Sequence, residues 1–150
     1  MITAVFDTNI YFQAAVGKGG PAAECWQMVL NGAVRVYTSE HALAEVEDVL
    51  TRPRLRRQFP SLTNERISSL LKNYRSFSEI SDQVTQFLKL GRDADDEEFL
   101  NLALTESVEF LVTRDKDLLD LRLDPEFLNS YPNLKIVNPF EFLQAVRESK

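Results

Sequence analysis

The stretch EFLVTRDKDLLDL, residues 109–121, decides the fold class. Its apolar run, residues 110–112, is short, aromatic and β-branched, and polar residues follow it at once, which predicts a buried strand. Asp115 and Asp117 come shortly after the run, and KDLLDL predicts a short helix. The aspartates therefore emerge where a strand leaves the core, either as groups for chemistry or as helix caps.

The opening residues MITAVFDTN repeat this pattern, with an apolar strand through Val5 and Phe6 that runs into Asp7. Further strands are predicted within residues 34–40 and 134–139, and helices over residues 21–32, 40–50, 63–77, 93–107 and 140–148. Residues 79–90 carry no legible pattern. Strands that alternate with helices predict an α/β fold with a parallel sheet and helices on both faces, and residues 1–150 are expected to form one domain.

Composition narrows the classes of protein. A single cysteine, Cys25, and the lack of an apolar stretch long enough to cross a bilayer predict a cytoplasmic protein with no membrane contact. The net charge of −6 argues against a uniformly positive surface that would bind nucleic acid without specificity. It does not exclude a local positively charged patch. The sequence RPRLRRQF supplies Arg52, Arg54, Arg56 and Arg57, which could hold RNA phosphates or form a solvated helix face.

Several carboxylates are candidates for a shared site. In a parallel sheet, ligands bind beyond the carboxyl ends of the strands, where Asp7 and Asp115 are expected. Asp95 and Asp96 open the 93–107 helix, and Glu45 lies at the margin of the apolar stripe of the 40–50 helix. Each acid alone has a structural explanation as a turn, a cap or an ion pair. Carboxylates that converge would repel one another and need a cation, and hard oxygen ligands without His or Cys favour Mg²⁺ or Mn²⁺.

Four segments resemble the signature segments of the PIN-domain family, in the expected order and over nearly the whole chain. They are VFDTNIYF (residues 5–12), SEHALAEVEDVL (39–50), RDADDEEFLNLAL (92–104) and FLVTRDKDLL (110–119). LTRPRL after the second segment is typical of a bacterial, toxin-like branch, and Arg114 stands where many relatives have Gly but VapC-like toxins often have Arg. The ordered set is more specific than any single motif.

This resemblance implies a three-layer α/β/α fold and a metal-dependent ribonuclease site. The catalytic acids fall on Asp7, Glu45, Asp96 and Asp115, with Asp7, Asp96 and Asp115 as the metal ligands. Asn9, Thr113, Asp117 and Asp95 fall on supporting positions, and Asp95 is the weaker claimant for the place given to Asp96. The implied partners are an RNA substrate, a small antitoxin protein and a second copy of the chain in a homodimer.

Two other readings stay open. An inactive PIN-like module could bind RNA or protein without cleaving it. An Asp-nucleophile phosphatase is less well supported, because Asn9 stands where one phosphatase class needs a second aspartate.

Overall fold

The computed structural model describes residues 1–17, 19–87 and 94–149, and for residues 94–96 it describes the backbone only. Within this part of the chain five strands form one sheet: β1 (Ile2–Phe6), β2 (Val34–Thr38), β3 (Ser78–Ile80), β4 (Phe110–Val112) and β5 (Lys135–Val137). The strand order is β3-β2-β1-β4-β5, and every neighbouring pair is parallel. The predicted parallel sheet is confirmed.

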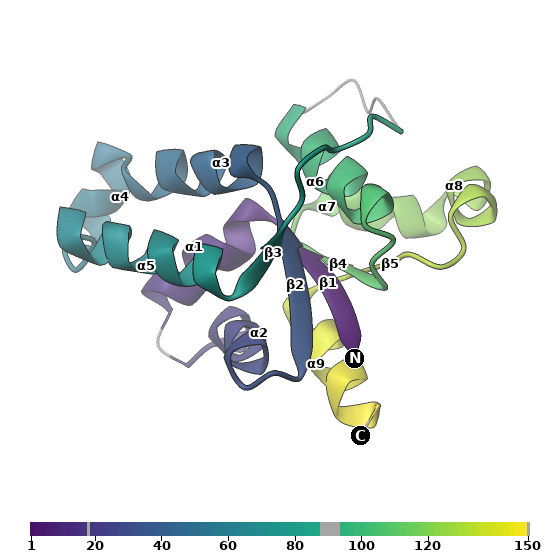
Figure 1. Ribbon diagram of the computed structural model, residues 1–150, viewed down its shortest axis with the longest axis horizontal. Helices are drawn as coiled ribbons and strands as arrows, with labels where there is room; N and C mark the ends of the chain where they lie inside the picture. The colour runs from purple at the N-terminus through teal and green to yellow at the C-terminus, as the bar shows by residue number, and fades with distance from the viewer. Residues whose placement is uncertain (18, 88–93, 150) are drawn as a thin grey trace.

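Helices cover both faces of this sheet (Figure 1). They are α1 (Thr8–Val16), α2 (Pro21–Leu30), α3 (Glu40–Leu50), α4 (Pro53–Gln58), α5 (Asn64–Ser76), α6 (Ala94–Thr105), α7 (Lys116–Leu119), α8 (Pro125–Ser130) and α9 (Pro139–Glu148), with a 3-10 turn, η1 (Asp120–Leu123), after α7. None of these described helices is long and apolar enough to cross a membrane. The three-layer α/β/α arrangement agrees with the predicted fold class.

Side-chain caps fix where several helices begin. The Ser39 hydroxyl accepts the N–H of Ala42 at 3.0 Å and starts α3 directly after β2. Asn138 accepts the N–H of Glu141 at 2.8 Å, and the Glu141 carboxylate accepts the Asn138 N–H in return, so α9 starts directly after β5. These caps turn the chain sharply from strand to helix at one edge of the sheet.

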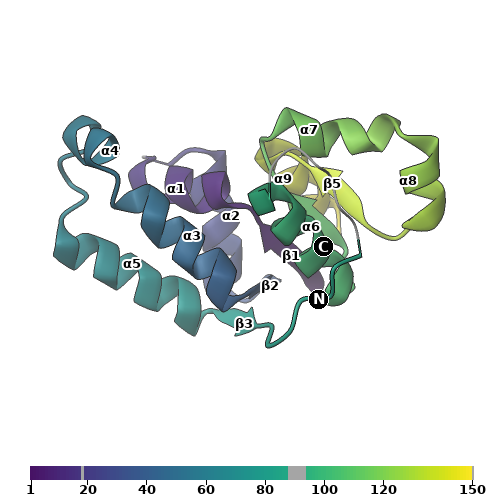
Figure 2. The same cartoon turned by 90° about the horizontal axis from the view of Figure 1, so that it is seen from above.

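The alternation of side chains along the strands builds two cores. In β4, Phe110 and Val112 enter the first core, while Leu111 enters the second. The first core is completed by α1, α2, α3, α5 and α9, and the second by α6, α7 and α8 with the start of α3. Figure 2 shows α3 and α5 on one side of the strands and α6, α7 and α8 on the other. Side-chain parity at a strand end therefore tells which layer of helices a residue faces.

Four elements lie beyond the predicted set. Strand β3 falls within the segment that has no legible pattern, because its residues SEI are only partly buried and pair with β2 through backbone hydrogen bonds. Helices α1, α4 and α8 were also not predicted. Pro53 opens α4 two residues after Thr51, the C-terminal cap of α3, and the short α8 lacks an apolar repeat long enough to recognise.

Candidate active site

Two neighbouring strands place Asp7 and Thr113 together at the carboxyl edge of the sheet. The Asp7 N–H donates to the Val112 carbonyl at 3.1 Å, and the Thr113 N–H donates to the Val137 carbonyl at 2.9 Å, so both residues continue the sheet ladder past the strand ends. Phe6 and Val112 face the first core. By alternation, Asp7 and Thr113 both face the second core, on the side of α6 and α7.

Thr113 joins two of the predicted acids. Its hydroxyl donates to Oδ2 of Asp7 and accepts the backbone N–H of Asp115 at 2.9 Å. The other Asp7 oxygen, Oδ1, accepts the N–H of Asn9 at 2.8 Å. Residues far apart in the sequence therefore form one hydrogen-bonded unit, in which Thr113 and the Asn9 backbone hold the orientation of the Asp7 carboxylate.

The Asp7 carboxylate is buried, with 3% of the residue exposed. Burial raises its pKa to about 6, against the hydrogen bonds from Thr113, Asn9 and Ile10, which lower it, and the nearby Asp115 raises it further. Desolvation is the dominant cause, because a charged carboxylate loses more hydration than these neutral donors replace. In the folded protein without metal, the ionised Asp7 carboxylate therefore lowers the stability of the fold at neutral pH.

We expect this cost to appear as a pH dependence of stability. The folded pKa lies about 2 units above that of the unfolded chain, so the folded state binds the proton more tightly and stability falls by about 3 kcal/mol as pH rises from 4 to above 6. Urea unfolding with a chelator present should show Asp7→Asn gaining stability over wild type as pH rises through this window. A difference that does not change with pH would mean that Asp7 is not a buried titrating group.

Both strand-end acids also act as helix caps. Asp7 caps α1, and Oδ1 of Asp115 accepts the N–H groups of Asp117 at 2.8 Å and Leu118 at 3.3 Å at the start of α7. Asn caps a helix about as well as Asp and carries no charge to desolvate. Capping therefore accounts for the position of Asp7 but not for a buried negative charge there.

The remaining predicted residues are placed in part. Glu45 is half-buried on α3, three residues after Ala42, which packs in the second core, and α3 contacts α6. The backbone of Asp95 and Asp96 lies in the first turn of α6, and their side chains lie outside the described residues. Asp117 is exposed in the first turn of α7.

The donors at this edge are of the kind that Mg²⁺ and Mn²⁺ prefer. Asp7 and Asp115 supply carboxylate oxygens, with no Cys or His in the hydrogen-bonded unit. No group of three or more acidic, His or Cys side chains suited to a metal is found within the described residues. The predicted ligand set includes Asp96, whose side chain is outside them, so the described donors fit a hard cation but do not by themselves complete its site.

The predicted arginine cluster lies away from this unit. Figures 1 and 2 both place α4 at the end of α3 that is remote from α6 and α7. Arg52 pairs with Asp48 at 3.0 Å, and Arg56 donates to the Leu62 carbonyl at 3.1 Å, so each already has an intramolecular partner. The exposed Arg54 and Arg57 form no ion pair with another described residue. These two are the members of the cluster that could still hold phosphates.

Arg114 is a candidate that the sequence analysis did not include among the functional residues. It is exposed, stands between Thr113 and Asp115, and forms no ion pair within the described part of the chain. The available signal was its position in the segment FLVTRDKDLL, where it is flanked by Thr113 and Asp115 of the hydrogen-bonded unit.

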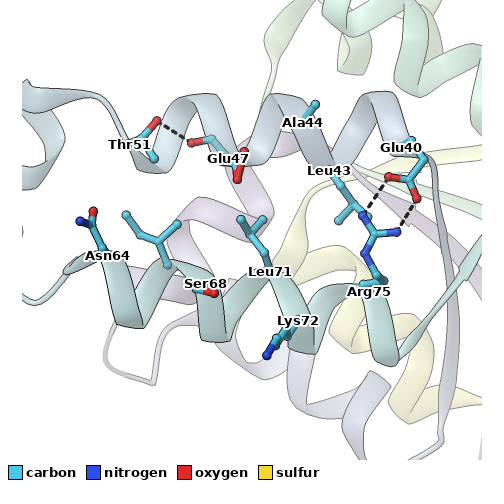
Figure 3. A pocket seen from close by; sticks show the side chains of 11 residues that line it. Glu40, Leu43, Ala44, Glu47, Thr51, Asn64, Ser68, Leu71, Lys72 and Arg75 are labelled. Carbon is cyan, nitrogen blue, oxygen red and sulfur yellow. Dashed lines mark hydrogen bonds and ion pairs between the residues drawn. The ribbon is translucent and has the colours of Figure 1, made fainter.

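A groove of about 520 Å³ lies between α3 and α5, separate from the strand ends (Figure 3). Leu43, Ile67 and Leu71 contribute apolar side chains, and Arg75 pairs with both oxygens of Glu40 at one end. It contains none of the strand-end acids, so its size does not make it the candidate active site.

A parallel sheet between two helical layers, with acids hydrogen-bonded together at its carboxyl edge, defines the class: an α/β/α protein with an acidic site at the strand ends. The chain belongs to the PIN-domain family, whose family model matches residues 3–117. That match includes Asp7, Glu45, Asp96 and Asp115.

Two relatives extend this finding. The chain is 33% identical over 145 residues to the uncharacterized protein MJ1680 of Methanocaldococcus jannaschii, which covers 95% of this chain and 90% of that protein. It is also similar to a chain in the crystal structure of VapBC2 from Rickettsia felis bound to a DNA fragment from their promoter, with a TM-score of 0.57, 18% identity, and coverage of 91% of this chain and 98% of that chain. At this level of identity, the second likeness shows a shared fold.

Proposed function

We propose that the protein is a divalent-metal-dependent ribonuclease that hydrolyses RNA phosphodiester bonds. The buried Asp7 carboxylate carries this proposal, since its described neighbours supply hydroxyl and amide donors but no cation. A buried anion without a compensating charge is destabilising unless a cation joins it. Its place at the carboxyl edge, in a chain that belongs to the PIN-domain family, supports a metal-binding role.

In this proposal Asp7, Asp96 and Asp115 hold Mg²⁺ or Mn²⁺, and Glu45 binds the metal or steers a water molecule. The bound metal would lower the pKa of the attacking water and offset negative charge on the scissile phosphate. Thr113 fixes the Asp7 carboxylate and the backbone of Asp115 relative to each other. Asn9, Asp117 and Asp95 are supporting residues, and no protein side chain acts as the nucleophile.

Cleavage of single-stranded RNA with Mg²⁺ or Mn²⁺, compared with the same protein in chelator, tests the activity directly. Wild-type protein that binds RNA but leaves it intact with either metal would favour a noncatalytic binding module instead.

We expect Mg²⁺ or Mn²⁺ to raise the melting temperature of the wild-type protein. A cation that binds only the folded state stabilises it by mass action and relieves the cost of the buried Asp7 anion. Differential scanning fluorimetry over a millimolar range of each ion measures the shift, and Asp7→Asn should lose most of it. Equal shifts in wild type and Asp7→Asn would place the ion elsewhere.

We further propose a role as the toxin of a toxin–antitoxin pair, with a small antitoxin partner and a homodimer. The support is the fold shared with the VapBC2 structure and the membership of the PIN-domain family. Expression of the chain should arrest growth, and co-expression of a small DNA-binding protein from the neighbouring gene should relieve the arrest. Growth that continues at normal rate despite active nuclease would favour RNA processing.

A further inference from the structure

Arg114 follows Thr113 at the end of β4, so continued alternation predicts that its side chain leaves the strand end on the side opposite to Asp7. Alternation beyond β4 places Thr113 toward the second core and Arg114 toward the first, where α2 and α9 lie. The electrostatics of α2 agree with this direction: burial and Glu24 raise the pKa of the Cys25 thiol, while the positive charge of Arg114 lowers it.

Within the described part of the chain, Arg114 forms no ion pair and no side-chain hydrogen bond. The nearby Arg122 holds the Glu141 carboxylate at 3.0 and 3.1 Å, so the acid in the first turn of α9 is already occupied. Other cations that pair with described acids are Arg52, Arg75, Lys116, Lys135 and Arg147. An anion that approaches between α7 and α9 would meet Arg114 without having to displace an ion pair.

Phe140 is an exposed aromatic residue at the same edge. It is 66% exposed at the second position of α9, whereas Phe142 and Leu143 are buried, so its ring is on the outward face of the helix. Helical side chains lean toward the N-terminus, which for α9 is the carboxyl edge of the sheet.

The register of β4 and β5 relates Phe140 to Arg114. Val112 pairs with Val137, and the Thr113 N–H donates to the Val137 carbonyl at 2.9 Å, so the same register, continued one residue past Thr113, is expected to set Arg114 opposite Pro139. The Cys25 thiol, whose pKa the positive charge of Arg114 lowers, donates to the Pro139 carbonyl at 3.7 Å. Pro139 is the residue before Phe140.

We propose that Arg114 and Phe140 form a subsite for single-stranded RNA beside the acidic site. Arg114 holds a phosphate of a nucleotide next to the cleaved bond, and Phe140 stacks on an unpaired base. An exposed guanidinium that no described residue binds and an exposed ring match the two recognition elements of single-stranded RNA, its phosphates and its base faces. A duplex would hide those faces by stacking. The inference rests on the proposed ribonuclease function and adds two residues outside the acidic site that bind the substrate, and the side from which the RNA enters.

The test measures binding without cleavage. Arg114→Gln and Phe140→Ala are made in the Asp7→Asn background, and fluorescence anisotropy with a short labelled single-stranded RNA gives Kd at several salt concentrations. Phe140→Ala is expected to weaken binding by about fivefold to a hundredfold, the range for loss of one stacked base. Arg114→Gln is expected to lower the slope of log Kd against log salt by about 0.7, the value for one single-strand phosphate contact.

Matched controls lie at the other edge of the sheet. Phe77 is 48% exposed just before β3, and Arg35 is exposed near the start of β2. Phe77→Ala and Arg35→Gln should leave Kd and its salt slope unchanged. Melting temperatures of all four variants should stay close to the background protein, since each altered side chain is largely in solvent.

Abasic substitutions along the RNA identify the stacked base. An abasic substitution at one position of the RNA should weaken binding to the Asp7→Asn protein, in which Phe140 is intact. The same substitution should cause no further loss of affinity when Phe140→Ala is added. Additive losses at every position, unchanged Kd in both variants, or no measurable RNA binding would overturn the subsite. Loss of binding to a protein partner with RNA affinity intact would assign this surface to that partner instead.

The two proposals can fail separately. Wild-type protein that never cleaves RNA, combined with the expected binding pattern, would remove the nuclease but keep the subsite. For this second case Arg114→Gln and Phe140→Ala are made in the otherwise wild-type protein. If they cleave RNA with unchanged KM and kcat, the nuclease is kept and the subsite is removed.

Discussion

Asp7→Asn is expected to abolish RNA cleavage and, at the same time, to stabilise the metal-free fold at neutral pH. Asn keeps the size of the side chain and can still accept the Asn9 N–H that caps α1. It removes the charge that a metal needs, and cleavage should fall at least about a hundredfold, the scale for losing one strong electrostatic contact to a transition state. The buried anion that destabilises the wild-type protein is removed by the same change.

Two measurements on the same preparation separate catalysis from capping. RNA cleavage with Mg²⁺ reports the site, and urea unfolding in chelator reports the fold. Asp115→Asn should likewise lose activity because it removes a charge that a metal needs, while α7 stays capped because Asn can still accept the N–H groups that begin it. Asp48→Asn is the control, since Asp48 is exposed on α3 and its carboxylate pairs with the exposed Arg52. Full activity in Asp7→Asn and Asp115→Asn would leave both residues as helix caps.

Asp96→Asn is expected to lose nearly all cleavage, whereas Asp95→Asn should keep most of it. Asp96 precedes Phe99 and Leu100 by three and four residues, and both of these are buried in the second core, the side that Asp7 faces. Asp95 precedes the half-buried Glu98 and the buried Phe99. The proposal therefore takes Asp96 as the third acid, and the pair of variants tests that choice.

The comparison is sharp because the two substitutions are chemically identical and adjacent in the first turn of α6. Each removes one negative charge near a helix N-terminus, so their effects on helix stability should be similar. Steady-state cleavage rates at saturating Mg²⁺ measure the difference. Similar activity in the two variants would remove the preference for Asp96.

Some elements could be predicted because local pattern and tertiary role agree. The run at residues 110–112 is a buried strand on both faces, and its abrupt end marks the carboxyl edge of the sheet. Ser39 is a plausible N-cap in the sequence and caps α3 in the fold, whereas Asn138, which lies within the predicted strand 134–139, caps α9. In contrast, β3 has three residues and little apolar character, so its strand conformation depends on the backbone of β2 rather than on its own side chains.

The candidate site, like the fold, could be predicted from the sequence only in part. Its acids could be proposed because they follow strand ends or helix starts, but each had an equally good local explanation, and the structure shows that Asp7 and Asp115 do serve as caps. The same analysis assigned no role to Phe140, because an aromatic residue beside an apolar stripe gives no sign of whether it is exposed.

The sequence by itself determined four of the five described strands, their alternation with helices in a parallel sheet, and the chemical nature of the donors, because these follow from short-range periodicity and residue type. Only the tertiary structure decided that Thr113 bridges Asp7 and Asp115, since β1 and β4 become neighbours only after the intervening chain has folded. It also decided that Asp7 is buried and its pKa raised, because desolvation depends on the whole packed surroundings of a carboxylate and not on the residues next to it in the chain.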